Sequence, residues 1–406
     1  MRKILILIMC IFFTSCSFNI PFFQTQTLSS KKLIQKNGIE KNLLISSNID
    51  KKHDKKDTLS LSNDKIKEVT QIVYKKPQVK EEKIEPKEEI KEEVKEVVKT
   101  TTSKEPKITK LSNFRFKKIA FVGDSHIASD YIPQYFRKTI GIYSLGFIPP
   151  VLPKWHNQSL VSYYVKGAKT EYLINTKNNL SFGGINANCF NVCNMQINLD
   201  FIANDLFYIE FKDNKWDIKK YANNIQNINL NVQNSKIGGF ITNNEIYIDN
   251  LGINGASIYN YQRINEDLER QVANILDYDL VIFSFGTNES VADSVNEEKF
   301  MQNYKSIINS FRGINTKIIL MIPPEPVVYK DRQYKKGPSN EIVNKLIFKL
   351  ANEQGYFVFD TNALMQNEGG KQAWIEQGKS LKNAHLSKKG YDYVAIKLLD
   401  FIKNIK

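Results

Sequence analysis

From Phe114 onward, short apolar runs alternate with amphipathic stretches. Four of these runs are apolar almost throughout, which is typical of strands buried on both faces. They are 117–122 (KKIAFV), 278–286 (YDLVIFSFG), 316–324 (TKIILMIPP) and 356–360 (YFVFD). Helical spacing is expected for 130–140, 261–276, 296–311, 339–355 and Ser387–Asn404. This alternation predicts an α/β fold with a parallel sheet covered by helices on both faces.

A second pattern occupies about 155–250. Its segments alternate in polarity, are rich in aromatic residues and are punctuated by Asn and Gly, which indicates strands and turns. The pattern predicts a small β-sandwich inserted into the α/β domain, which otherwise covers 113–406. The alternative is a set of long loops, and loops of this length without structure are uncommon.

The N-terminus, MRKILILIMCIFFTSCS, has the pattern of an export signal. Two basic residues precede the apolar run Ile4–Phe13, which is too short to span a membrane, and small residues follow. We expect a signal peptide over 1–15. The residues before Cys16 resemble a bacterial lipoprotein cleavage site, although Phe13 departs from the usual aliphatic residue. A lipidated Cys16 would anchor the chain on a membrane, and the alternatives are plain secretion or an uncleaved anchor.

Residues 16–112 have the composition of a spacer. Ser, Asn, Lys and Asp dominate first, a Lys/Glu-rich stretch follows, and aromatic residues are nearly absent. Such a segment cannot bury enough apolar surface to fold, and its charges favour an extended chain. Part of it, near Lys87 to Val98, has the Glu and Lys spacing of a solvated helix. We therefore expect a periplasmic domain tethered to a bacterial membrane through a lipid anchor.

The composition narrows the possible partners. The formal net charge is +14, yet export and the scattered positions of the lysines argue against nucleic acid. Acidic cell-wall polymer or anionic lipid fits better. Cys189 and Cys193 are expected to form a disulfide in an oxidising compartment, with two free thiols as the alternative. Two cysteines without nearby histidine do not make a zinc site. No metal cluster, phosphate-binding loop or dinucleotide fingerprint appears, so no cofactor is implied.

Four polar features follow expected strands or precede expected helices. In a parallel sheet, sites form at the carboxyl ends of strands. Ser125 in GDSH follows 117–122, Gly255 lies in GINGA, Asn288 in GTNE follows 278–286, and His385 precedes the last helix. Separately, they are explained by turns, a helix cap and a surface loop. Together, they supply a nucleophile, two oxyanion donors and a base.

In this order, GDSH, GINGA, GTNE and HLSKKGY resemble the four sequence blocks of the SGNH or GDSL hydrolase family. The resemblance covers about Phe114 to the C-terminus apart from the insertion. It implies a three-layer α/β fold with Ser125 as nucleophile and His385 as base. It also implies an oxyanion hole made of the Ser125 N–H, the Gly255 N–H and the Asn288 side chain.

A narrower resemblance involves GDSHIASD, YDLVIFSFGTNES, DTNALMQNEGGKQAW and the insertion between the first two blocks. These features look like peptidoglycan O-acetylesterases, which carry a carbohydrate-binding-type β-module at that point. That group removes acetyl groups from the 6-position of N-acetylmuramic acid. The resemblance implies peptidoglycan glycan strands as substrate, and we expect the protein to act as a monomer.

One position departs from the family pattern. The family has Asp three residues before the histidine, and this chain has Lys382 there. The missing acid would hold the imidazole and stabilise its charged form. Three readings remain open. In the first, another group orients His385: Asn383, a backbone carbonyl, or a carboxylate such as Glu376, Asp360 or Asp392. In the second, the enzyme works as a Ser–His dyad. In the third, the domain has lost its catalytic activity and only binds cell wall.

The leading hypothesis is a membrane-tethered serine esterase that hydrolyses O-acetyl groups of peptidoglycan through an acyl-enzyme. A degenerate wall-binding protein on the same scaffold is the second hypothesis. A glycan O-acetyltransferase is the third, and it differs only in which acceptor reaches the acyl-enzyme. His126, next to Ser125, is expected to belong to the loop rather than to act as a base.

Overall fold

The computed structural model describes residues 114–177 and 179–405. The expected signal peptide, Cys16 lipidation site and spacer with its solvated helix lie outside these residues. Within the described part of the chain, no helix combines the length and apolarity needed to cross a membrane.

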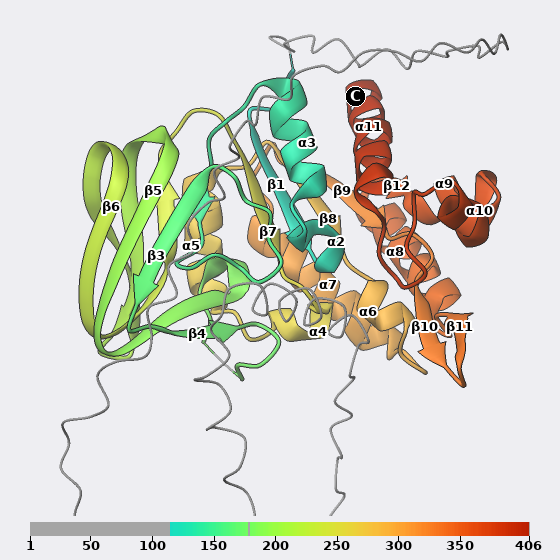
Figure 1. Cartoon of the computed structure of the whole chain (residues 1–406), viewed down its shortest axis with the longest axis horizontal. Coiled ribbons are helices and arrows are strands. Elements are labelled where there is room, and N and C mark those ends of the chain that lie inside the picture. The colour runs from blue at the N-terminus through green and yellow to red at the C-terminus, as the bar shows by residue number, and fades with distance from the viewer. Residues whose placement is uncertain (1–113, 178, 406) are drawn as a thin grey trace, which may run out of the picture. The chain divides into compact units, whose positions relative to one another are not determined.

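A five-stranded parallel sheet forms the centre of the α/β region (Figure 1), with strand order β12-β9-β8-β1-β7. Every neighbouring pair is parallel. The strands are β1 (Lys118–Gly123), β7 (Tyr247–Gly252), β8 (Leu280–Ser284), β9 (Lys317–Ile322) and β12 (Phe357–Asp360). The four apolar runs expected as strands are confirmed as β1, β8, β9 and β12.

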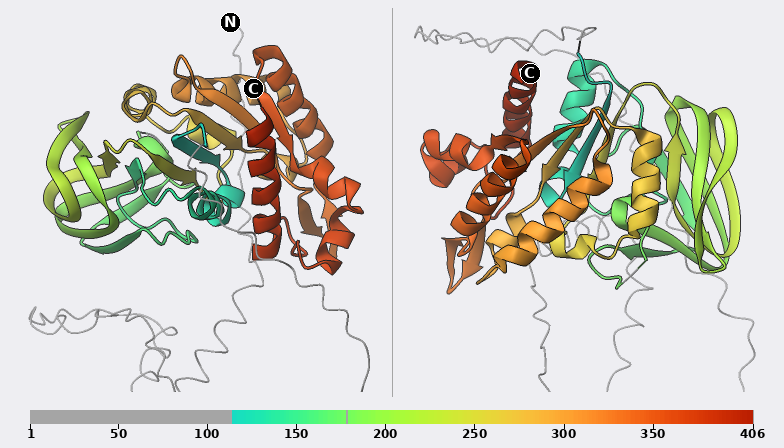
Figure 2. Two further views of the ribbon diagram at one scale, coloured as in Figure 1. Left: turned by 90° about the horizontal axis from the view of Figure 1, so that it is seen from above. Right: turned by 180° about the vertical axis from the view of Figure 1, so that it is seen from behind.

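Both faces of the sheet are buried, as the continuous apolar runs predict. Ile119 and Phe121 of β1 join one hydrophobic cluster, and Ala120 and Val122 join the other, because successive side chains point to opposite faces. The first cluster includes side chains of α3 (Tyr131–Ile140), α9 (Thr361–Asn367), α10 (Gly370–Glu376) and α11 (Lys388–Asn404). The second includes those of α5 (Glu266–Leu276), α7 (Glu297–Phe311) and α8 (Asn340–Gln354). Figure 2 shows the two helical layers from above and behind. The expected helices are confirmed as α3, α5, α7, α8 and α11.

An antiparallel sheet lies between β1 and β7 in sequence. Its order is β2-β6-β5-β3, and β4 also pairs with β5. Residues 206–211 of β5 pair on one side with 216–222 and on the other with 236–242, so the long hairpin folds back on itself. The strands are β2 (Phe147–Ile148), β3 (Val161–Lys166), β4 (Lys169–Tyr172), β5 (Ile185–Lys212) and β6 (Lys215–Thr242).

The expected range of the insertion, about 155–250, is wrong at both ends. The antiparallel sheet begins at Phe147 and ends at Thr242, and Tyr247–Gly252 form β7 of the parallel sheet. The misassignment has a physical reason. β7 contains two buried polar side chains, Asp249 and Asn250, which make it look like a half-exposed strand in sequence. Asp249 accepts hydrogen bonds from the N–H groups of Gly146 (2.8 Å) and Phe147 (3.1 Å), and so joins the two sheets.

Cys189 and Cys193 form a disulfide within β5. Residues four apart in a regular strand would be about 13 Å apart, whereas these Cα atoms are 5.5 Å apart. A register shift between Cys189 and Val192 shortens the strand locally. Both sulfurs are buried, while Phe190 and Val192 between them are exposed.

Short elements follow the carboxyl ends of the parallel strands and gather at one edge of the sheet. The segments after β1, β7 and β8 begin α2 (Ser125–Ala128), α4 (Ile258–Tyr261) and α6 (Thr287–Ser290). After β9 the chain forms a hairpin of β10 (Val327–Lys330) and β11 (Gln333–Lys336). Elsewhere, the short helix η2 (Phe182–Gly184) precedes β5. This edge is where sites form in parallel α/β sheets.

Candidate active site

Ser125 begins α2 directly after β1. Asp124 caps this helix, since its Oδ1 accepts from the His126 N–H at 2.9 Å and its own N–H donates to the Ser284 carbonyl at 3.1 Å. A side chain at Gly123 would place Cβ 2.4 Å from the Ser284 oxygen, so only glycine fits there. The turn is therefore fixed from both sides, and Ser125 stands at the carboxyl end of the sheet.

His385 meets Ser125 across 260 residues of sequence. Its Nε2 lies 2.9 Å from the Ser125 Oγ. The loop that carries His385 connects α10 to α11 and is closed on itself. The Leu381 N–H donates to the His385 carbonyl at 3.0 Å, and the His385 N–H donates to Asn383 Oδ1 at 2.9 Å. The imidazole thus stands at hydrogen-bond distance from a hydroxyl whose proton it can accept.

Gly255 lies in a tight turn beside the Ser125 segment. The turn runs from Ile253 to Ala256 and is closed by the Ala256 N–H to the Ile253 carbonyl (3.0 Å). Gly255 has φ +77°, a value that favours glycine at this turn position. The Ile253 N–H donates to the Gly123 carbonyl at 2.9 Å, which ties the turn to the end of β1.

Asn288 in α6 contacts the same turn. Its Nδ2 donates to the Ala256 carbonyl at 2.6 Å, and the amide carries a second N–H. The structure therefore links Ser125, Gly255 and Asn288 through the adjacent ends of β1, β7 and β8. These are the three residues that the family resemblance assigns to an oxyanion hole, and that role stays a prediction.

Two buried carboxyl groups support this side of the site. Glu289 Oε1 accepts from the Ile258 N–H at 2.7 Å and so fixes the start of α4, just after the Gly255 turn. Burial raises the pKa of Glu289 to about 7 and that of Asp124 to about 6. Neither side chain has a recorded hydrogen bond to the His385 ring. Sequence reasoning missed Glu289, although an acidic residue directly after Asn288 in GTNE was a visible signal.

A cation, rather than an acid, lies near His385. Burial and then the charge of Lys371 lower the pKa of His385 below its usual value. The Lys371 Nζ donates to the Asn383 carbonyl at 2.6 Å, and burial lowers the pKa of Lys371 to about 8. Lys382, at the position of the family's acid, is exposed. Sequence reasoning missed Lys371 because its contact with the His385 loop is tertiary.

The groups considered from sequence as substitutes for the acid have other partners. Asn383 Oδ1 accepts from the His385 backbone, Asp360 caps α9 through the Ala363 N–H, Glu376 accepts from Gln372, and Asp392 pairs with Lys388. Within 114–177 and 179–405, the recorded hydrogen bond of the His385 ring is the one to Ser125. The geometry in the described residues is that of a Ser–His pair.

His126 lies beside the pair but is buried. Its Nδ1 is 3.1 Å from the Tyr391 hydroxyl, and its ring centroid is 5.7 Å from that of His385. Burial, then the charges of His385 and Lys371, hold the pKa of His126 well below its usual value. His126 thus packs against Tyr391 and His385, and its exclusion as the base stays a prediction.

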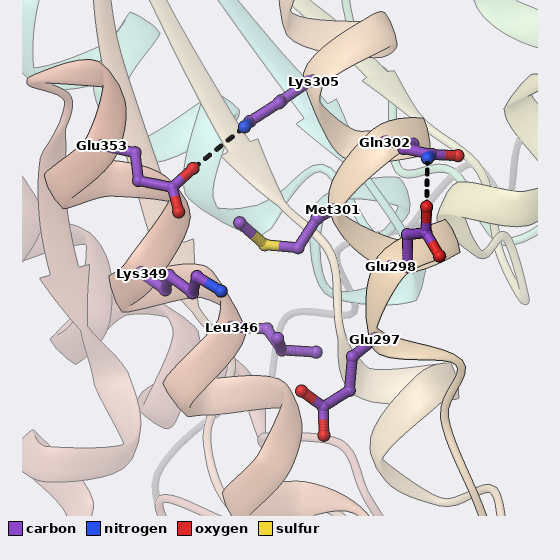
Figure 3. Close-up of a pocket in the computed structure, with 8 residues that line it drawn as sticks. All are labelled: Glu297, Glu298, Met301, Gln302, Lys305, Leu346, Lys349 and Glu353. Atoms are coloured by element: carbon purple, nitrogen blue, oxygen red, sulfur yellow. Dashed lines mark hydrogen bonds and ion pairs between the residues drawn. The ribbon is translucent and has the colours of Figure 1, made fainter.

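A groove of about 440 Å³ lies elsewhere, between α7 and α8. Figure 3 shows its lining residues, which include the Lys305–Glu353 ion pair at 2.9 Å and none of the residues above. Among the described residues, no group of three or more His, Cys, Asp or Glu side chains is arranged to hold a metal ion.

The three-layer arrangement, with its parallel sheet and these residues at the carboxyl edge, is the α/β fold of the SGNH hydrolases. Residues 239–393 match the sequence model described as the GDSL-like Lipase/Acylhydrolase family. The matched range contains Gly255, Asn288 and His385. Ser125 lies before it in the sequence. No curated protein matches the sequence.

A solved structure shares the fold. The structure titled "Peptidoglycan O-acetylesterase in action, 5 min" has a TM-score of 0.59 and 20% identity, and the alignment covers 70% of this chain and 90% of that one. At this identity the likeness establishes the fold. A lipase/acylhydrolase from Enterococcus faecalis (TM-score 0.32, 19% identity, 39% of this chain and 77% of that one) also matches. So does an acetyl xylan esterase (TM-score 0.31, 21% identity, 38% and 80%).

Proposed function

We propose that the protein is a serine esterase that removes O-acetyl groups from peptidoglycan, at the 6-position of N-acetylmuramic acid. The observation that carries the proposal is the 2.9 Å distance between His385 Nε2 and Ser125 Oγ. The acylhydrolase family match and the fold support the reaction class. The peptidoglycan O-acetylesterase with the same fold motivates the substrate.

In this mechanism, Ser125 Oγ attacks the acetyl carbonyl carbon while His385 Nε2 accepts the hydroxyl proton. The Ser125 N–H, the Gly255 N–H and the Asn288 side chain stabilise the oxyanion that forms. His385 then donates the proton to the sugar oxygen, which leaves as an alcohol. Water, deprotonated by the same imidazole, hydrolyses the acetyl-serine and releases acetate.

We propose that Ser125 and His385 act as a dyad. No carboxylate recorded in the described residues bonds to the His385 ring, and Lys371 disfavours the imidazolium. A base with a lowered pKa stays neutral in mildly acidic solution but accepts a proton less readily. The oxyanion donors, which several backbone hydrogen bonds hold in place, would then supply a large share of the rate enhancement.

The location belongs to the same proposal. A signal peptide over 1–15, lipidation at Cys16 and the charged spacer to residue 112 would tether the domain to a membrane at the peptidoglycan layer. The net charge of +14 suits an anionic wall polymer.

The test is acetate release from O-acetylated peptidoglycan, measured beside hydrolysis of 4-nitrophenyl acetate. Ser125→Ala is the inactive variant, and Ser294→Ala, which alters an exposed serine between α6 and α7, is the matched control. We expect the native protein and Ser294→Ala to release acetate and Ser125→Ala to release none. Hydrolysis of the small ester alone would overturn the substrate assignment. Absence of Ser125-dependent hydrolysis of both would overturn the esterase in favour of a wall-binding protein.

A further inference from the structure

Trp155 is an exposed aromatic residue held in an unfavourable backbone conformation. It lies in the loop between β2 and β3, is 55% exposed and has φ +69°. A bulky residue with positive φ is uncommon because its Cβ clashes with the backbone, and the surrounding structure must impose it. Such strain at an exposed side chain suggests a function for its position.

The residues after Trp155 attach this loop to the helix that begins with Ser125. His156 is 8% exposed, and its N–H donates to the Pro153 carbonyl at 3.2 Å. The Asn157 Nδ2 donates to the Ser129 carbonyl at 2.9 Å. Ser129 is the C-cap of α2, so it lies about 6 Å along the helix axis from Ser125. Trp155 thus lies two residues from a contact with the C-terminal end of the helix that Ser125 begins.

A second exposed apolar side chain lies beside the Gly255 turn. Ile174, just after β4, is 47% exposed, and its Cγ2 is 3.9 Å from where a Cβ on Gly255 would stand. The Arg263 guanidinium fixes this segment by donating to the Leu173 carbonyl at 2.6 Å. Burial raises the pKa of Tyr172, the last residue of β4, and a hydrogen bond with the Lys154 backbone opposes that shift, which makes the two segments neighbours.

We propose that Trp155 and Ile174 form a subsite for the sugar ring that carries the ester, which rests on the proposed function. The C–H face of a pyranose can pack on the indole while its hydroxyl groups bond to polar neighbours. The exposed residues that flank these two side chains include Lys154, Asn175 and Lys177, whose side chains can bond to sugar hydroxyl groups. The Lys154 ammonium lies over the Trp155 ring, 5.4 Å from its centroid. A fatty acyl chain would instead require a continuous apolar groove.

The experiment compares one glycan ester with two 4-nitrophenyl esters, one short and one long. Kinetic constants would be measured for O-acetylated peptidoglycan fragments, 4-nitrophenyl acetate and a long-chain 4-nitrophenyl ester, with native protein, Trp155→Ala and Trp155→Phe. The matched control is Tyr143→Ala, which removes an aromatic side chain of similar exposure (56%) outside the proposed subsite. We expect Trp155→Ala to raise KM for the glycan about tenfold and to leave kcat/KM for 4-nitrophenyl acetate unchanged. Trp155→Phe should retain most of the affinity.

Two outcomes would overturn the subsite. In one, Trp155→Ala changes all esters equally or none. In the other, only the long-chain ester is affected, which would identify an acyl-chain site. Binding of the same fragments to Ser125→Ala and to Ser125→Ala/Trp155→Ala, by calorimetry, separates this proposal from the esterase. Weaker binding only in the double variant supports the subsite even without hydrolysis, and equal binding contradicts it.

Discussion

The two sides of the proposed site differ in how they are held. Ser125, Gly255 and Asn288 follow three adjacent strands, β1, β7 and β8, and backbone hydrogen bonds join their turns. His385 lies in a loop between two helices, and its ring has one recorded hydrogen bond among the described residues, to Ser125. The buried carboxyl groups of Asp124 and Glu289 lie next to Ser125 and Asn288 in sequence, whereas the charge of Lys371 acts on His385.

In the proposed mechanism, this difference separates two tasks. Stabilising an oxyanion requires donors that do not move during the reaction, and the ends of parallel strands supply them. Accepting a proton requires a base that is neutral at the working pH. Burial and a nearby cation lower the pKa of His385, the proposed base, whereas an acid would stabilise its charged form.

The largest expected effect tests whether the two sides act as one unit. Ser125→Ala and His385→Ala should each lower kcat/KM for 4-nitrophenyl acetate by about ten-thousand-fold or more. The double variant should lose no more than the more damaged single variant, because either change removes the same proton-coupled attack. Multiplicative losses would show that the residues act independently and would break the proposed pair.

Removing the Asn288 side chain, a proposed oxyanion donor, should have the next largest effect. Asn288→Ala should lower kcat by about a hundredfold to a thousandfold with a small change in KM, since the interaction forms in the transition state. Asn288 also bonds the Ala256 carbonyl, so thermal unfolding of the variant would be measured in parallel. A loss below about fivefold in a folded variant would remove Asn288 from the oxyanion hole.

Adding the missing acid should sharpen the contrast. Lys382 is exposed, so Lys382→Asp should be accommodated and should raise kcat/KM by roughly tenfold, because a carboxylate can orient and stabilise the imidazolium. Lys382→Asn is the control that removes the lysine without adding charge. If neither variant gains activity, an orienting group already acts on His385 and the dyad is wrong.

The smallest effect concerns the cation and depends on pH. The charge of Lys371 lowers the pKa of His385, and its loss in Lys371→Met should raise that pKa. Because only neutral imidazole can act as the base, the acid limb of the kcat/KM profile should move to higher pH. The loss should stay below about tenfold and be confined to acidic solution. Lys371→Arg should keep the native profile, and an unshifted profile in Lys371→Met would exclude this role.

Much of the fold could be predicted because its signals are local. The continuous apolar runs of β1, β8, β9 and β12 identify the parallel sheet, and Ser387 identifies the start of α11 as its N-cap. β7 was assigned to the insertion because Asp249 is buried by contacts with Gly146 and Phe147, about one hundred residues away in sequence. The hairpin β10–β11 was missed, since its eight strand residues are polar or half exposed.

The residues of the site also differ in whether the sequence could predict them. Ser125, Gly255, Asn288 and His385 stand in motifs with recognisable order, and the structure brings Ser125 and His385 together. Lys371 could not be found from sequence. Its effect depends on burial and on a hydrogen bond to the Asn383 carbonyl, a backbone group present at every position. What surrounds a base is decided by tertiary packing, which no motif spacing specifies.

The most direct test of the central claim is labelling by a fluorophosphonate, which reacts irreversibly only with an activated serine. The protein would be labelled at several pH values, digested and analysed by mass spectrometry, beside His385→Ala and Ser294→Ala. Our account predicts label on Ser125 in the native protein and in Ser294→Ala, and none in His385→Ala. An unlabelled Ser125, or equal labelling without His385, would show that this pair does not form a catalytic dyad.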